Sequence, residues 1–432
     1  MRIDRLGALG AAPQLLRAIA HASGRADRPP PAALTGDWFG SRAVIAPTVL
    51  AEPTAPGEVF TSAPDDGGTA VGGGWIGYLS YPDAGADGLD GRIPVAAGGW
   101  TDCVLRQDRD EIWWYESLSG DAMPPWLAQS LTTPAPPAPW RIDWTAPDRD
   151  VHRAGVLACL AAISAGEVYQ ACVCTQFTGT LHGSSLDFFA DAVARTAPAR
   201  GAYVAGDWGA VASLSPEMFL SRHHDTVVSS PIKGTLPSHA DPALLRRSAK
   251  DVAENIMIVD LVRNDLGRVA VTGTVGVPEL LAVRAAPGVW HLVSTVSARL
   301  PAELPMRDLL AATFPPASVT GTPKGRAREL LSHWEPRRRG VYCGTVGLAS
   351  PLAGTELNVA IRTVEFDRTG AAVLGVGGGI TADSDAGAEW QECLDKAAAT
   401  IGLTAASEAP RRRARGVTER RDAPRSPAGT PL

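Results

Sequence analysis

The fold class is decided by one stretch of the chain, GVYCGTVGLASPLAGTELNVAIRTVEFDRTGAAVLGVGGGITADSDAGAEWQECLDKAAATIGL, residues 340–403. Three of its segments, 340–348, 357–366 and 371–377, have the apolar, β-branched composition of buried strands. Apolar residues at helical spacing predict a helix over 386–403. Because three strands precede a single helix, the stretch does not follow the alternation of a Rossmann or barrel repeat. It indicates a mixed α/β, or α+β, layered sheet.

The chain outside this stretch has the same mixture of elements. Its patterns predict helices over 148–166, 241–266, 306–313 and 323–333, and strands over 42–46, 75–81, 168–177, 210–220, 226–231 and 269–283. The proline-rich segment 132–139 predicts a linker between a subdomain of residues 1–145 and a larger domain of residues 146–405. The tail, 406–432, is rich in Arg and Pro and is predicted to be disordered.

Composition limits the class of protein. The chain has 432 residues, of which 45% are hydrophobic and 20% charged, as in globular proteins. The net charge of −6 argues against a nucleic-acid enzyme, and the short basic tail does little to change that. We find neither a signal peptide nor an apolar run that could span a membrane. Six cysteines without a paired CxxC motif are expected to stay reduced, so we expect a cytoplasmic protein.

Lysine is scarce in this sequence. Only four of the 40 basic residues are lysines, namely Lys233, Lys250, Lys324 and Lys396. Arginine therefore does nearly all the general cationic work, and a retained lysine can mark a site that needs an amine able to lose its proton. Codon bias with four chance survivors explains the same count about equally well.

Acidic residues on two predicted helices are candidate metal ligands. Glu389, Glu392 and Lys396 lie three and four positions apart, on one face of the last helix. A solvated face with a Glu–Lys pair explains this pattern as well. Asp251 and Glu254 lie three apart on the long helix. If the two helices face each other, which the sequence alone does not establish, Glu254 and Glu392 would offer oxygen ligands of the kind that Mg²⁺ prefers.

Further candidates lie between these helices. Glu217 is in an apolar segment, where burial would favour the protonated carboxyl of a general acid, and Lys233 follows as a candidate nucleophile. Two ordinary strand residues in a surface salt bridge are the simpler alternative. The Gly377–Gly379 run is expected to form a loop before the last helix, with free amides that could hold a carboxylate. Cys343 is expected to pack within a strand rather than to act as a nucleophile.

Five stretches resemble the chorismate-utilising enzymes, in the same order and with the same spacing. They are GEVYQ (166–170), LSPEMFL with PIKGT (214–235), DVAENIMIVDLVRNDLGRVAV (251–271), ASVTGTPKGRARELL (317–331), and the block with CGTVG, IRT, GGGITADS and EWQECLDKA (343–397). The resemblance covers about residues 150–405. It implies a layered sandwich rich in antiparallel β-sheet, with helices outside, and an enzyme that acts on chorismate with Mg²⁺.

Two positions distinguish the members of this family. Lys233 in PIKGT is similar to the lysine of the aminodeoxychorismate synthases, whereas anthranilate synthases typically carry alanine there. Gln170 stands where isochorismate and salicylate synthases place the lysine that activates water. The pattern therefore favours the aminodeoxychorismate synthase branch, in which ammonia rather than water is the nucleophile and 4-amino-4-deoxychorismate is the product.

The resemblance also implies a role for each candidate residue. Lys233 would attack ring C2, Glu217 would protonate the leaving C4 hydroxyl, and His291 would lie beside the ring. This chemistry needs an uncharged amine and a protonated carboxyl. The implied substrate-binding residues are Arg362, Lys396, Tyr342, Thr320, Gln170, Gly377, Gly378 and Gly379. The implied Mg²⁺ ligands are Glu254 and Glu392, with Asp251 and Glu389 close by.

The source of ammonia is expected to be a second protein. No glutaminase motif is visible, so a glutamine amidotransferase subunit would supply ammonia for a product leading to 4-aminobenzoate, folate or a related metabolite. The segment ACVCTQF (171–177) departs from the Asn-containing, Arg-ending strand common in the family, and residues 72–81 resemble it only weakly. The alternatives are an anthranilate synthase component I and a non-catalytic subunit that binds an amidotransferase.

Overall fold

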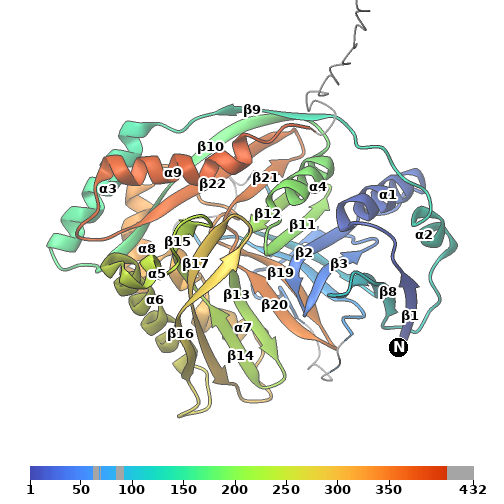
Figure 1. Cartoon of the computed structure of the whole chain (residues 1–432), viewed down its shortest axis with the longest axis horizontal. Coiled ribbons are helices and arrows are strands. Elements are labelled where there is room, and N and C mark those ends of the chain that lie inside the picture. Colours follow the sequence, from blue (N-terminus) through green and yellow to red (C-terminus); the bar gives the residue numbers. More distant parts are fainter. Residues whose placement is uncertain (62–67, 69, 84–91, 406–432) are drawn as a thin grey trace, which may run out of the picture.

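Two large antiparallel sheets form the centre of the computed structural model, which describes residues 1–61, 68, 70–83 and 92–405 (Figure 1). In the described residues the first sheet has twelve strands. Eleven of them follow the order β1 (Arg2–Gly7), β8 (Trp113–Ser117), β7 (Cys103–Gln107), β3 (Ser41–Ala46), β2 (Ala32–Trp38), β11 (Arg200–Gly206), β12 (Gly209–Ser215), β21 (Thr363–Asp367), β22 (Ala371–Ile380), β10 (Gln170–Gly183) and β18 (Gly321–Thr322). The twelfth, β9 (Trp140–Thr145), pairs with β10.

The second sheet has ten strands in the described residues. Nine follow the order β15 (Ile232–Pro237), β17 (Val289–Arg299), β14 (Thr226–Ser230), β13 (Met218–His223), β20 (Gly354–Asn358), β19 (Thr345–Ser350), β5 (Gly74–Leu79), β6 (Ala96–Thr101) and β4 (Glu52–Pro53), and β16 (Gly276–Ala286) pairs with β17. The two sheets pack face to face through a buried cluster that includes Trp38 and Val44 of the first and Tyr78 and Leu348 of the second.

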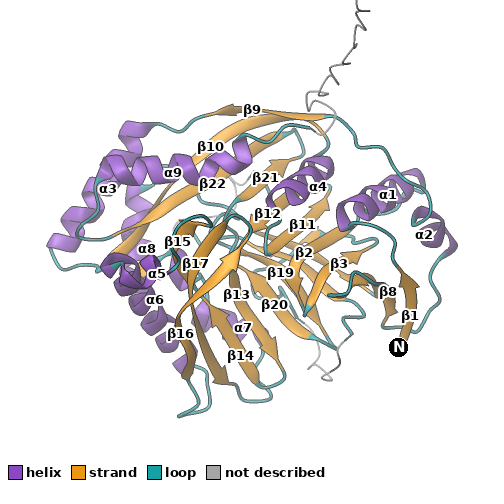
Figure 2. Ribbon diagram, in the orientation of Figure 1, coloured by secondary structure: helices purple, strands orange, loops and turns teal. Residues whose placement is uncertain are grey.

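Helices cover the outer faces of the sheets (Figure 2). Helices α1 (Ala12–Arg25), α4 (Ser185–Thr196) and α9 (Ala386–Ile401) lie on the first sheet, and α6 (Ala249–Gly267) and α7 (Met306–Thr313) on the second. Helices α3 (Arg149–Ser164) and α8 (Lys324–Trp334) pack against β10, α2 (Pro125–Ser130) against α1, and α5 (Ala243–Arg247) against α6. The predicted sandwich of antiparallel sheets with helices outside is confirmed.

The chain crosses between the sheets at two places where we predicted single strands. The segment 210–220 divides into β12 in the first sheet and β13 in the second, with Pro216 and Glu217 between them. Proline lacks the amide hydrogen that a central strand would need at this position. The segment 357–366 divides in the same way into β20 and β21. Both predictions were wrong, because composition does not show that a strand changes sheet.

Four further boundaries differ from the prediction. Ser248 separates α5 from α6 and caps α6, since its hydroxyl accepts a hydrogen bond from the Asp251 amide at 3.2 Å. Strand β16 begins at Gly276 rather than 269. The segment 341–344 is a turn, in which Cys343 has a φ of 66°, so Cys343 is buried but not in a strand. The Gly377–Gly379 run lies within β22, paired with β10, and is not a loop before α9.

The predicted boundary at about residue 145 stays a prediction. Strands from both sides of it share each sheet, because β2 pairs with β11 in the first and β5 with β19 in the second. The predicted disordered tail, 406–432, lies outside the described residues. Within the described residues, the helices are too short or too polar to cross a membrane.

Candidate active site

A cavity of about 510 Å³ lies where the two crossings bring the sheets together with α6 and α9. Its wall contains residues from strands of both sheets and from both helices. Twelve of the fifteen residues predicted from the sequence line it: Lys233, Glu217, His291, Arg362, Lys396, Tyr342, Gly377, Gly378, Gly379, Glu254, Glu392 and Asp251. The structure thus brings together residues that are far apart in the sequence, while their roles stay predictions.

Three predicted residues lie behind the wall rather than in it. Thr320 is fully buried, and its hydroxyl donates to the Pro316 carbonyl at 2.9 Å. Gln170 is buried against Gly379, and its Oε1 has no hydrogen-bond partner in the described part of the chain. Glu389 is buried and accepts a hydrogen bond from the Ser384 hydroxyl at 2.7 Å. These residues can shape the wall but do not face the cavity directly.

Glu217 lies at the first crossing, and the local backbone fixes it there. Its amide donates to the Ser215 hydroxyl at 3.1 Å, and its carbonyl accepts from the Val359 amide at 3.0 Å. The residue is only 4% exposed. Burial raises the pKa of this carboxyl from its ordinary value of 4.5 to about 7, and the nearby Lys233 ammonium partly offsets the rise. A protonated carboxyl is therefore available at neutral pH, as a general acid requires.

We expect Glu217→Gln to stabilise the protein at pH 8 but not at pH 4. Because the pKa of Glu217 is higher in the folded than in the unfolded chain, its contribution to stability is lost as pH rises from about 4.5 to about 7. The advantage of the variant should grow through this window to at most about 3 kcal/mol and stay constant above it. Urea unfolding at several pH values measures it, with the exposed Glu52→Gln as a control. A difference independent of pH would contradict the burial of a titrating carboxyl.

Lys233 projects from β15 toward the metal-ligand candidates. Its Nζ lies 3.9 Å from Glu254 Oε2, and both side chains are largely buried. Gly234 next to it has a φ of 85°, and a Cβ there would lie 3.0 Å from the Asp251 Cβ. Glycine is needed at 234 because the conformation is left-handed and α6 approaches closely. This close approach sets the amine of Lys233 in the cavity wall.

His291 and Arg362 form another part of the wall. His291 on β17 shares a 2.9 Å hydrogen bond with Thr235, between its Nδ1 and the threonine hydroxyl. Burial, and then the nearby Arg362 guanidinium, lower the pKa of His291 to about 4, so its ring is neutral at pH 7. Burial also lowers the pKa of Arg362, for which the described residues show no anionic partner. A partly buried cation that lines a cavity without a counter-ion favours an anionic ligand.

Three carboxylates from α6 and α9, Asp251, Glu254 and Glu392, line the cavity, and Glu389 lies behind its wall. Burial raises the pKa of Glu254 and of Glu389, and neighbouring acidic residues raise both further. Burial would also raise the pKa of Glu392, but the ammonium groups of Lys396, Lys250 and Lys233 lower it. Glu392 and Lys396 form an ion pair at 2.7 Å. Lys250 Nζ of α6 lies 3.9 Å from Glu389 Oε1 of α9, so the two helices approach each other here, a condition that the sequence had left open.

These carboxylates suit a hard cation in kind but are not arranged around one in this structure. Mg²⁺ prefers oxygen ligands, and carboxylates supply them. Glu254 Oε1 is buried and has no hydrogen-bond partner among the described residues, so it is free to coordinate. Within the same residues, however, no three acidic, histidine or cysteine groups converge as a metal site would require. The donor set fits a magnesium ion in chemical kind, and Glu254 and Glu392 are the residues that would hold it.

The glycines of β22 pack closely against side chains from other elements. A Cβ at Gly375 would collide with the ring of Tyr342, one at Gly378 with Glu389 Oε2, and one at Gly379 with the Gln170 amide. Lys396 Nζ donates to the Gly377 carbonyl at 2.7 Å. The absence of side chains along this part of β22 leaves room for Tyr342, Glu389 and Gln170 to pack directly against the strand. The prediction that these glycines form a loop was wrong, because they lie within strand β22. Binding of an anion by their amides stays a prediction.

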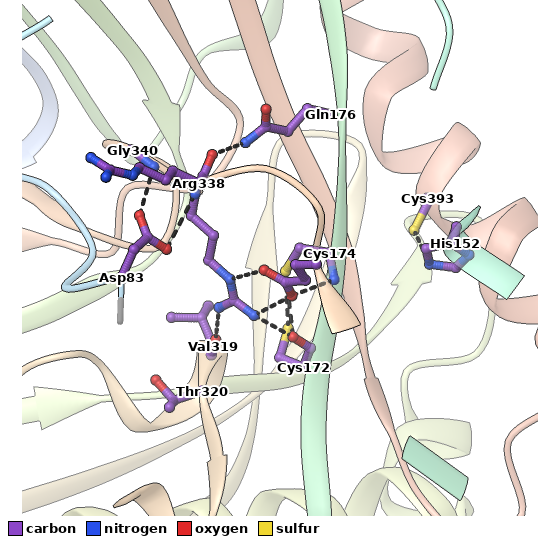
Figure 3. Close-up of polar contacts among 12 residues, drawn as sticks. Asp83, His152, Cys172, Cys174, Gln176, Val319, Thr320, Arg338, Gly340 and Cys393 are labelled. Carbon is purple, nitrogen blue, oxygen red and sulfur yellow. Dashed lines mark hydrogen bonds and ion pairs between the residues drawn. The ribbon is translucent and has the colours of Figure 1, made fainter. Parts of the chain in front are cut away.

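A buried arginine, Arg339, supports the wall from behind through Val319 and Cys172, two residues that Figure 3 labels. Arg339 is 1% exposed and donates to the carbonyls of Val319 at 2.8 Å and Cys172 at 2.5 Å, both of which line the cavity. It also donates to both oxygens of Glu335, at 2.7 and 2.8 Å. Glu335 in turn accepts a hydrogen bond from the Cys174 amide at 2.9 Å. This pair fastens β10 to the segment that precedes Thr320.

Sequence reasoning missed several residues of the wall. Lys250 and Ser318 line the cavity, as does Cys172, whose Sγ lies 3.9 Å from that of Cys174 on the same face of β10. The scarcity of lysine singled out Lys250, but no pattern gave it a role. Ser318 and Cys172 carry no signal of composition or spacing, since their position depends on the meeting of distant segments.

The comparison that decides the family covers most of the chain. The family described as chorismate binding enzyme matches residues 50–402 of the 432. The chain belongs to the chorismate binding enzymes. Aminodeoxychorismate synthase component 1 of Klebsiella aerogenes is 46% identical over 243 residues, which cover 55% of this chain and 54% of that protein. The Escherichia coli (strain K12) protein of the same name is 43% identical over 241 residues, 54% and 53% of the two chains.

Other chorismate binding enzymes extend these similarities. Aminodeoxychorismate synthase of Streptomyces pristinaespiralis is 36% identical over 362 residues, which cover 76% of this chain and 50% of that protein. The chain thus spans about half the length of these curated relatives. Anthranilate synthase component I of Streptococcus pneumoniae has a similar structure, with a TM-score of 0.68, 25% identity and coverage of 93% and 92% of the two chains. The menaquinone-specific isochorismate synthase of Escherichia coli shares the fold at 17% identity, with a TM-score of 0.67 and coverage of 93% and 94%.

Proposed function

We propose that this chain is the chorismate-aminating component of an aminodeoxychorismate synthase. The observation that carries the proposal is Lys233 in the wall of the same cavity as the buried acid Glu217. An amine can act as a nucleophile, which a guanidinium cannot, and the chain retains only four lysines. Relatives named aminodeoxychorismate synthase component 1 support the same assignment.

The substrate is a dianion, and the cavity offers it cations. Arg362 and Lys396 would hold its carboxylates, with Tyr342 and the glycine strand against the ring. Glu254 and Glu392 would hold Mg²⁺, with Asp251 and Glu389 beside them, and the ion would supply positive charge to a substrate carboxylate. Neutral His291 would lie beside the ring without adding charge.

The proposed reaction has two displacements. The Lys233 amine forms a bond to ring C2 while the C4 hydroxyl departs as water, after it takes the proton of Glu217. Ammonia then forms a bond to C4 while the bond between C2 and Lys233 breaks, which restores the free amine. The new C4 ammonium group passes one proton to the Glu217 carboxylate, which restores the acid. The sum is chorismate plus ammonia giving 4-amino-4-deoxychorismate plus water. A separate glutamine amidotransferase subunit would deliver the ammonia.

The product identifies the reaction. Purified protein with chorismate, Mg²⁺ and ammonium at mildly alkaline pH should give 4-amino-4-deoxychorismate, which keeps its pyruvate-derived side chain, and excess chelator should abolish turnover. Mass and chromatographic retention against standards distinguish it from anthranilate. Anthranilate with released pyruvate would overturn the proposal in favour of an anthranilate synthase. A chain that binds chorismate without turnover would support a non-catalytic subunit.

A further inference from the structure

Lys250 lies between two carboxylates of the proposed metal site. Its Nζ is 3.9 Å from Glu254 Oε1, one turn along α6, and 3.9 Å from Glu389 Oε1 on α9. One ammonium group thus links two helices that are more than a hundred residues apart in the sequence. Both distances exceed hydrogen-bond length, so the group is held by charge alone.

The other cations near these carboxylates have different partners. Lys233 Nζ faces the second oxygen of Glu254, and Lys396 Nζ contacts Glu392 and the Gly377 carbonyl. Glu389 and the inner oxygen of Glu254 therefore have Lys250 as their shared counter-charge. Without it, two largely buried carboxylates on different helices would lose the ammonium group that lies 3.9 Å from both of them.

We propose that Lys250 is an internal counter-ion whose ammonium holds the place between Glu254 and Glu389 until a divalent cation binds and displaces it. This inference rests on the proposed function, since it concerns the magnesium site of that function. A magnesium ion takes oxygen ligands at about 2.1 Å, so an ammonium close to the same oxygens would repel it. The side chain of Lys250 is 53% exposed and can withdraw into solvent.

The counter-ion has two opposite consequences. It stabilises the metal-free protein, because it reduces repulsion between α6 and α9. The same ammonium weakens magnesium binding, because magnesium must displace it from the Glu254 and Glu389 carboxylates that already attract it. Removing the charge should therefore lower stability without metal and raise the affinity for metal, whereas loss of an ordinary metal-site residue lowers the affinity.

The variant Lys250→Met tests both consequences, because methionine keeps an unbranched chain and loses the charge. Thermal unfolding in a titration with magnesium chloride alone yields the apparent dissociation constant and the metal-free midpoint together. We expect roughly three- to tenfold tighter magnesium binding, the scale of two half-exposed ion pairs. The metal-free midpoint should be lower than in the unmodified protein, and the difference should vanish at saturating magnesium.

Two controls separate this effect from a general change of charge. Arg263→Met removes one positive charge from the same helix at a similarly exposed residue, which pairs with Asp260. Lys250→Arg keeps the charge. Both should bind magnesium as the unmodified protein does. If Lys250→Met binds magnesium equally well or more weakly than the unmodified protein, the counter-ion role of Lys250 is wrong, but the metal site of the proposed function still stands. If magnesium stabilises neither the unmodified protein nor any variant, both the metal site and this inference are wrong.

Discussion

Replacing Lys233 by alanine should lower the formation of 4-amino-4-deoxychorismate by a hundredfold or more. Losses of about 10² to 10⁴ are typical when one positioned catalytic group is removed. The amine lies in the cavity wall with Glu217, and alanine offers no nucleophile in its place. Steady-state rates with ammonium as the nitrogen donor measure the loss, because they do not depend on a partner subunit.

Lysine 233 also faces Glu254, so the loss of charge has to be separated from the loss of the nucleophile. Its Nζ lies 3.9 Å from Glu254 Oε2. Lys233→Arg restores a cation beside Glu254 but cannot attack the ring. We expect both variants to be inactive. Recovery of turnover in Lys233→Arg would assign the residue a purely electrostatic role, and unchanged turnover in Lys233→Ala would remove the covalent step altogether.

The second large effect concerns stability. Arg339→Met should lower the free energy of unfolding by about 3–5 kcal/mol, the usual cost of removing one partner from a buried ion pair. The variant leaves Glu335 without its cation and frees the Val319 and Cys172 carbonyls. Arg339 also lies over the Tyr81 ring, with its Cζ 4.4 Å from the ring centroid. Urea unfolding measures the change.

A neighbouring arginine offers the matched control. Arg337 is exposed, so Arg337→Met should change the free energy of unfolding by no more than about 0.5 kcal/mol. Adding Glu335→Gln to Arg339→Met should recover part of the loss, because the second substitution removes the stranded charge. A loss below about 1 kcal/mol for Arg339→Met would show that the pair does not hold the wall together.

Local sequence patterns predicted the elements better than their connections. Helices α3, α8 and α9 follow from apolar periodicity, because each buries one face against a sheet. The crossings at 216 and 359–362 were missed, because a strand that changes sheet has the composition of one that continues. Only Pro216 gives a local signal, because proline is excluded from the central strands of a sheet.

In the candidate site too, the sequence predicted individual residues better than the contacts between distant segments. Lys233 and Glu254 follow from the family resemblance, and the structure places both in one cavity. The glycine run was recognised, but its purpose was not, since clearance for Tyr342, Gln170 and Glu389 depends on residues from other elements. Lys250 could not be assigned for the same reason, because one of its two carboxylates is on another helix.

The crossing of the chain between the sheets has a consequence for how the protein acquires its activity. The cavity wall draws on segments from Cys172 to Lys396, and each sheet supplies part of it. Contacts so distant along the chain carry a large loop-closure cost, and they form slowly compared with helices and hairpins. Glu217 and Lys233 lie close in sequence, around the β13–β14 hairpin, but Arg362, Glu254 and Glu392 come from other parts of the chain. We therefore expect the complete cavity to form late in folding, after both sheets have assembled.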